Sequence, residues 1–153
     1  MNDSIVACLL THFAETVTDD DIRPLIAESL NVANGHLHAI EQLFAAEGVA
    51  KPAAYPVEKH VYAGAPKLFS DIFYLEYIYH MSKFGLASHG GAIALASRQD
   101  VFDLFRQFLN EAIQINDRAR QLLLEKGVYV RPPYMVYPKE ATFIEKQSFL
   151  TGW

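Results

Sequence analysis

The sequence is poor in cysteine, with Cys8 the only one among 153 residues. A single thiol excludes an intramolecular disulfide framework and is typical of a protein that works in a reducing compartment. We therefore expect a cytoplasmic protein in which Cys8 acts as a small buried hydrophobic residue.

Basic stripes and long apolar runs are also missing. The chain has 13 Lys and Arg against 18 Asp and Glu, and its basic residues are scattered, whereas nucleic-acid-binding proteins gather them on one surface. The most apolar segment, 72–95, is interrupted by Glu76, His80, Lys83 and His89, but a membrane span needs about 18 to 20 apolar residues. We expect neither a nucleic-acid partner nor a membrane.

Apolar residues do recur with the spacing of helices, and no segment alternates as a half-buried strand does. With 51% hydrophobic residues the chain can bury one core, so we predict one all-α domain over residues 1–153. The sequence predicts four helices, at about 3–17, 20–47, 67–96 and 98–126.

Local signals mark the ends of these helices. The acidic run Asp19 to Asp21 predicts an N-cap for the second helix, and Ser97, followed by an acid three residues later, predicts one for the fourth. Gly48 and Gly127 follow the second and fourth helices, where a left-handed residue often ends a helix.

Connection lengths predict the topology. Short links make hairpins of the first two and the last two helices, whereas about twenty residues separate the second helix from the third. Twenty extended residues reach about 65 Å, more than the length of about 40 Å expected for a 27-residue helix, so the link can cross the bundle and leave these two helices parallel. Two hairpins joined by a long crossover is the ferritin-like four-helix bundle connectivity. Residues 128–153, rich in proline and aromatics, are predicted to form an extended C-terminal arm.

Several stretches carry a resemblance to a known family. They are HLHAIEQLF at 36–44, APKLFSD at 65–71, SRQDVFDLF at 97–105, KGVYVRPPY at 126–134 and KQSFLTGW at 146–153. Together they closely resemble an uncharacterised family of spore-forming bacteria, whose members are named "putative spore coat proteins" and often carry the domain in tandem copies. The resemblance implies a ferritin-like bundle, no established reaction, and the spore coat as a location. The family's first helix usually begins further upstream, and KQSFLTGW matches the family near the junction to a second copy. This chain therefore resembles a single unit, with Met1 inside a longer helix.

Histidines and carboxylates raise the question of a metal site. A ferritin-like di-iron centre needs E-x-x-H on two helices, and this spacing does not occur in the sequence. The reversed spacing H-x-x-E occurs twice, in His12 with Glu15 and in His38 with Glu41.

The register of the second helix separates His36 from His38. The core seam is predicted to contain Ile22, Ile26, Ser29, Ala33, His36, Ile40 and Leu43. His38 lies about 200° around the helix from His36, so it should face outward with Glu41. We predict that His36 is a core histidine bonded to a neighbour or to water. The alternative is a metal site of His36, His89 and Glu111 that would take iron, manganese or zinc.

Three functions remain open from the sequence. The leading hypothesis is a non-enzymatic helical bundle that acts by self-association or assembly, with no catalytic residues and no cofactor. The second is a ferritin-like metal-binding or oxidase domain, and the third is a small-ligand binder that uses the bundle interior.

We also predict at least a homodimer, because the first helix is too short to cover longer partners and aromatic residues are enriched at interfaces. The predicted interface residues are Tyr129, Tyr134, Tyr137, Phe149 and Trp153. The alternative is that the arm folds back and completes its own core.

Overall fold

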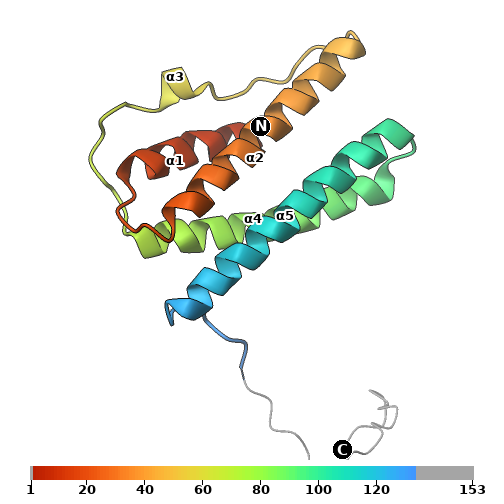
Figure 1. Ribbon diagram of the computed structural model, residues 1–153. Helices are drawn as coiled ribbons and strands as arrows, with labels where there is room; N and C mark the ends of the chain where they lie inside the picture. Colours follow the sequence, from red (N-terminus) through yellow and green to blue (C-terminus); the bar gives the residue numbers. More distant parts are fainter. Residues whose placement is uncertain (1, 134–153) are drawn as a thin grey trace, which may run out of the picture.

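The computed structural model describes residues 2–133, and within that range the chain is all-helical, without strands. Four of the helices in this range are long and one is short, and Figure 1 shows how they are arranged. Their bounds are α1 (Asn2–Thr16), α2 (Arg23–Ala46), α3 (Val57–His60), α4 (Asp71–Leu95) and α5 (Gln99–Glu125). The four predicted helices are therefore present, although α4 begins four residues later than predicted and α3 was not predicted.

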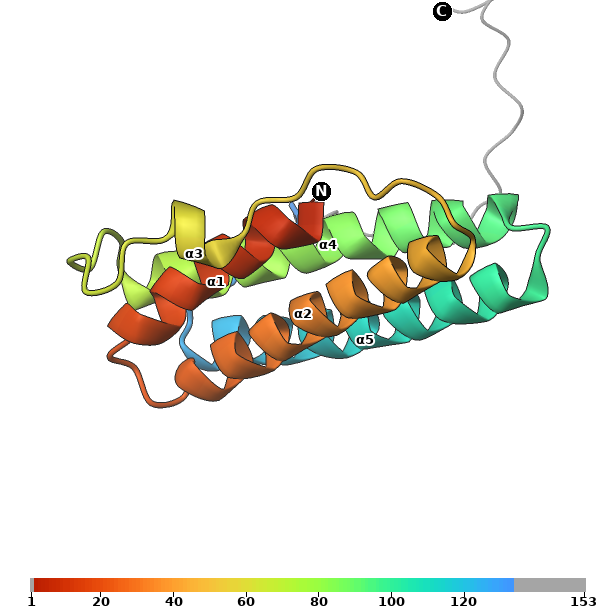
Figure 2. The ribbon, with the colours of Figure 1, turned by 90° about the horizontal axis from the view of Figure 1, so that it is seen from above.

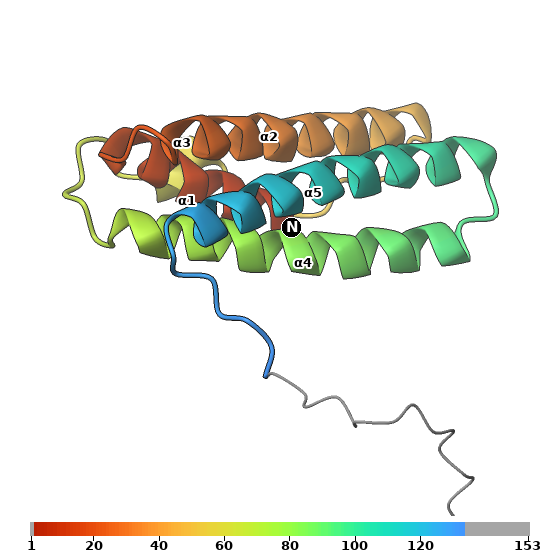
Figure 3. The same ribbon diagram turned by 60° about the horizontal axis from the view of Figure 1, so that its bottom comes forward.

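The helices form two hairpins, α1–α2 and α4–α5, joined by a long link that contains α3 and runs back along the bundle (Figure 2). Lys126, which follows α5, contacts Asp19 ahead of α2 at 2.8 Å. Arg98, ahead of α5, contacts Glu47 beyond α2 at 2.8 Å. The helices α2 and α5 are therefore antiparallel, and α2 and α4 run parallel, as the length of the link predicted (Figure 3).

The glycine signals at the ends of α2 and α5 are confirmed, whereas the residue ahead of α2 is Ile22 and no side chain caps the helix itself. Asp19 Oδ1 accepts hydrogen bonds from the backbone N–H groups of Asp21 and Ile22, at 3.0 and 3.2 Å, and so caps the turn that leads into α2. Gly48 and Gly127 have φ values of 64° and 71°, the left-handed conformation that glycine adopts without strain.

The prediction that Ser97 caps α5 is wrong. The residue ahead of the helix is Arg98, whose extended backbone occupies the cap position, and no side chain caps the helix there. Arg98 instead forms ion pairs with Asp100 and Glu47. In contrast, Ser70 caps α4, because its Oγ accepts a hydrogen bond from the backbone N–H of Phe73 at 3.2 Å.

Cys8 also differs from expectation, because it is only half-buried. Its Sγ donates to the carbonyl oxygen of Tyr55 in the long link, at 3.4 Å. Burial, and then the charge of Glu58, raise the pKa of the thiol.

The core lies where α1 packs on the other three long helices. Phe13 stacks on Tyr74 with ring centroids 4.0 Å apart, and the Tyr74 hydroxyl lies 2.6 Å from Thr16 Oγ1. Among the described residues, none between 37 and 73 or between 83 and 107 is buried.

The bundle therefore has two unequal halves, as Figure 2 shows, because α1 lies alongside only one end of its partners. We call them the covered half and the open half. The covered half consists of α1 with residues 22–36, 71–82 and 108–126, and the open half consists of residues 37–46, 83–95 and 99–107. None of the described helices is long and apolar enough to cross a membrane.

Candidate functional site

His36 lies in α2 near the boundary between the two halves, with only 5% of its surface exposed. Its Nε2 lies 2.7 Å from Glu111 Oε2 on α5, and because a carboxylate oxygen accepts, Nε2 donates this hydrogen bond. The ring stacks on Phe108, with centroids 3.8 Å apart. The prediction of a core histidine bonded to a neighbour is confirmed, and His38 and Glu41 are exposed as predicted.

A second carboxylate faces the other nitrogen of the same ring. Asp3 Oδ2, from the first turn of α1, lies 3.8 Å from His36 Nδ1, a separation that allows an ion pair when the ring is protonated but is too long for a hydrogen bond. Sequence reasoning missed Asp3, because its place depends on how the start of α1 lies against the middle of α2, which no local spacing reveals.

His89 of α4 completes the cluster. Its ring lies 5.5 Å from that of His36, at an interplanar angle of 89°. Burial, and then the charge of His36, lower the pKa of His89, although Asp3 and Glu111 oppose the shift. The neutral form is therefore favoured, and it carries a ring nitrogen that can accept a hydrogen bond.

Gly85, one turn before His89, makes room for this arrangement. A Cβ atom at this position would lie 3.3 Å from the Cβ of Ala112 on α5 and 3.7 Å from the His89 ring. The missing side chain lets α4 approach α5 closely beside the histidines.

The structure thus brings together His36, His89 and Glu111, the three predicted metal candidates, and adds Asp3, so that each long helix contributes one side chain. Within residues 2–133, however, no three His, Cys, Asp or Glu side chains are arranged to hold a metal ion. His36 Nε2 donates to Glu111 instead. Glu111 is held in turn by Gln107, whose Nε2 donates to its other oxygen at 2.9 Å.

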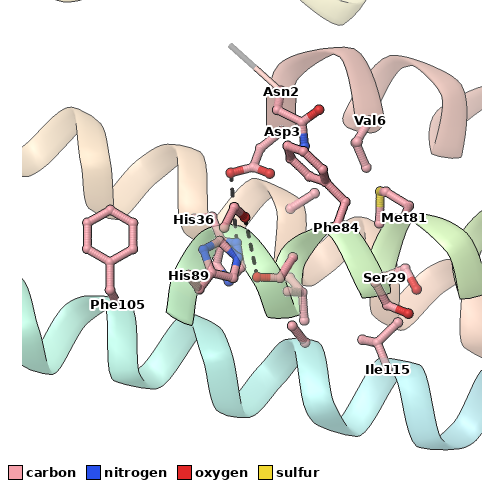
Figure 4. A pocket seen from close by; sticks show the side chains of 16 residues that line it. Asn2, Asp3, Val6, Ser29, His36, Met81, Phe84, His89, Phe105 and Ile115 are labelled. Carbon is pink, nitrogen blue, oxygen red and sulfur yellow. Dashed lines mark hydrogen bonds and ion pairs between the residues drawn. The ribbon is translucent and has the colours of Figure 1, made fainter. Parts of the chain in front are cut away.

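A pocket of about 240 Å³ adjoins this cluster (Figure 4). At one end lie Asp3, His36 and His89, and in Figure 4 Asp3 points toward His36. At the other end Ser29 lies near Met81 and Ile115. Ser29 is 3% exposed, and its Oγ has no hydrogen-bond partner among the described residues.

The predicted interface residues are only partly described. Tyr129 packs on its own bundle, where its hydroxyl lies 3.0 Å from that of Tyr79 on α4. Tyr134, Tyr137, Phe149 and Trp153 lie outside the described residues.

A different surface of the chain is strongly apolar. Along the side of α4 opposite its buried residues runs a row that we call the outer stripe, which consists of Phe73, His80, Phe84, Ala87, Gly91 and Leu95. These positions follow steps of seven, four, three, four and four, and all six residues are exposed. Leu95 is 88% exposed and Phe84 57%. His80 is the only titratable member of the outer stripe.

By its fold, the protein is an all-helical bundle of two hairpins joined by a long crossover. The chain belongs to the family described as "Protein of unknown function (DUF3231)", whose model matches residues 1–141. No curated protein matches it. Among solved structures, the chain is similar to a "putative spore coat protein" from Bacillus halodurans C-125, with 24% identity over 89% of this chain and 87% of the other and a TM-score of 0.76. At this level of identity, the likeness shows the fold.

Proposed function

We propose that the protein is a non-enzymatic building block that self-associates through the outer stripe of α4. The observation that carries the proposal is the exposure of this stripe. A helix at the surface of a monomer normally turns polar residues to water, whereas a helix that is apolar on all sides is normally buried. The outer stripe therefore has the character of a surface that is covered in the working protein.

A second copy of the chain is the occupant that the stripe fits best. Small residues, Ala87 and Gly91, lie between the large Phe84 and Leu95, so large side chains of one copy can fill the spaces beside small ones of another. Closed two-fold pairing, in which the same patch is used on both chains, is the commonest arrangement of identical subunits.

The kind of assembly is suggested by the solved structure with the same fold. That protein is named a putative spore coat protein, and a coat is built from many protein copies. We therefore propose a coat-like assembly as the setting of this chain, and a ferritin-like bundle as its fold. The support for the latter is the pair of hairpins joined by a crossover that leaves α2 and α4 parallel.

Sedimentation equilibrium at tens of micromolar tests the proposal. We expect the full chain to sediment at twice its monomer mass of 17.2 kDa. Gly91→Glu places a charge between Ala87 and Leu95 of the outer stripe, and apart from the neighbouring turns of α4 no described residue has an atom within 4 Å of the Cβ that it adds. This variant should fold and sediment as a monomer.

The matched control is Gly35→Glu in α2. Gly35 is also exposed, helical and free of contacts around an added Cβ, so the two variants share their charge and their gain of up to about 1 kcal/mol in helix propensity. Gly35→Glu should remain a dimer. A full chain that sediments at 17.2 kDa, or a Gly91→Glu variant that stays dimeric, contradicts the proposal. If a chain ending at Pro133 becomes monomeric, the contact belongs to the arm and the outer stripe is the wrong surface.

A further inference from the structure

The pocket beside His36 has features of a ligand site, and it shares only Phe84 with the outer stripe. Its walls are mainly apolar, with Val6, Ala33, Met81 and Ile115 among the lining residues. Its mouth opens beside the exposed residues Asn2 and Ser88. Since an apolar cavity of about 150 Å³ holds benzene, about 240 Å³ leaves room for an aromatic ring with a short side chain.

Polar groups line the pocket at both of its ends. Ser29 and His36 are seven residues apart on α2, which is a rise of about 10 Å along the helix. At the end away from Asp3, the buried Ser29 hydroxyl has no hydrogen-bond partner within residues 2–133, and an unsatisfied buried polar group costs about 1 to 3 kcal/mol. The Oγ itself has less than 1 Å² of accessible surface, so the Ser29 side chain would turn toward the pocket to bond to a polar group of a ligand at that end.

The side chains at the His36 end of the pocket determine which ligand charge is favoured there. The titratable side chains that line the pocket are Asp3, His36 and His89, and none of its described lining residues is Lys or Arg. His36 already donates to Glu111, whereas the one ion pair of Asp3 within the described part of the chain is its 3.8 Å contact with His36. The open carboxylate of Asp3 favours a cation and disfavours an anion.

We propose that this pocket binds a small aromatic amine whose far end carries a hydroxyl. The ammonium group pairs with Asp3 and can donate to His89, the ring lies against the apolar walls, and the hydroxyl meets Ser29 Oγ. Asp3, His89 and Ser29 come from three different helices of one chain, so the site is complete without a second copy.

Isothermal titration calorimetry of the full chain at pH 7.5 tests the proposal with three probes of similar shape. Tyramine carries both polar ends, phenethylamine lacks the hydroxyl, and 3-(4-hydroxyphenyl)propionate replaces the ammonium by a carboxylate. We expect saturable binding of tyramine in the millimolar range or below, weaker binding of phenethylamine, and no binding of the acid.

Two variants test which end of the pocket binds the ammonium group and which binds the hydroxyl group. Asp3→Asn should weaken tyramine binding about tenfold to a hundredfold, as expected for a hydrogen bond to a charged group. Asp20→Asn is the control, because it changes the net charge equally at a side chain that is 95% exposed and outside the pocket, and it should leave binding unchanged. Ser29→Ala should weaken tyramine about threefold to tenfold and leave phenethylamine unaffected.

Three results would overturn the proposal: no saturable binding of tyramine in the millimolar range, binding of the acid as tight as that of the amine, or equal effects of Asp3→Asn and Asp20→Asn. Because Asp3 is a partly exposed side chain in the first turn of α1, the Asn variant should fold, and circular dichroism checks this. Because Phe84 belongs to both the pocket lining and the outer stripe, the titrations are made on the parent chain and on Gly91→Glu, and the Asp3→Asn and Ser29→Ala effects should be the same in both.

Discussion

The covered and open halves of the bundle are built from the same helices but pack differently. In the covered half, Leu10, Tyr74 and Leu123 have no exposed surface. In the open half, the described residues of α2, α4 and α5 continue the same heptad-like spacing, but none of them is buried. Apolar spacing therefore places a residue on the inner face of a helix, whereas burial also requires a fourth helix above that face.

The histidine–carboxylate cluster lies near the boundary between the two halves. His36 is the last buried residue of α2, and Phe108, on which it stacks, is the first buried residue of α5. The pocket follows from this position, because the start of α1 covers part of the space above the cluster and leaves the rest open. Self-association and ligand binding, the two proposals, thus both concern the part of the bundle where the cover by α1 ends.

The largest expected contrast between the halves comes from one substitution made twice in α2. Leu25 is fully buried in the covered half, and Leu25→Ala should lower the free energy of unfolding by about 2 to 5 kcal/mol. Leu43 is half-buried on the same helix in the open half, and Leu43→Ala should lower the free energy of unfolding by less than half of that amount. Urea titrations at one protein concentration measure both, and equal losses would mean that the open half has a core of its own.

A smaller effect is expected at the boundary. His36→Ala should lower the free energy of unfolding by about 1 to 3 kcal/mol, because it leaves a cavity and removes the hydrogen-bond partner of Glu111 Oε2. Thermal unfolding with and without chelator distinguishes this structural role from the metal hypothesis. If the variant is as stable as the parent in chelator but loses a stabilisation by iron, manganese or zinc, the structural role is refuted.

Substitutions of two serines allow the starts of α4 and α5 to be compared. Ser70→Ala removes a hydrogen bond to the backbone at the start of α4 in the covered half and should cost about 1 kcal/mol. Ser97→Ala, just ahead of α5 in the open half, removes no cap and should change the unfolding free energy by less than about 0.5 kcal/mol. If Ser97→Ala lowers the free energy of unfolding as much as Ser70→Ala does, Ser97 caps α5 after all.

The smallest expected effect is a pH dependence at His89. Its pKa in the folded protein is lowered, so the unfolded chain, with a pKa near 6.5, binds the proton more readily. His89 therefore contributes stability above about pH 6.5 that is lost as the pH falls toward the folded pKa. Urea midpoints between pH 7.5 and 5.5 should fall less steeply in His89→Gln than in the parent, and identical slopes would contradict the shift.

Sequence reasoning predicted the architecture well because its signals are local. The caps at Asp19 and Gly48 and the seam through His36 depend on residues a few positions apart, and the crossover followed from a link length. The short helix α3 was missed because its four residues lie in a link rich in proline and alanine, and four residues carry no usable period. Ser97 shows that a cap motif displaced by one residue from the true helix start predicts the wrong contact.

The candidate site depended more on tertiary structure. His36, His89 and Glu111 could be named from helix faces, but Asp3 and the unpartnered hydroxyl of Ser29 become visible only when α1 lies against α2. The outer stripe was missed for a related reason. α4 is apolar on nearly every side, so its sequence does not indicate which side is buried until Tyr74, Ile78 and Ser82 are seen to face inward.

Hydrogen exchange read by mass spectrometry at two protein concentrations tests the central claim, that the outer stripe of α4 is covered by a second copy. Diluting the full chain should speed exchange at the amides of residues 83–95, because the open half of α4 then loses its partner. Exchange in α1 between Val6 and Phe13 should stay unchanged, because those residues are buried within one chain. Exchange at residues 83–95 that is the same at both concentrations, in a chain that sedimentation shows to dissociate between them, would contradict the account.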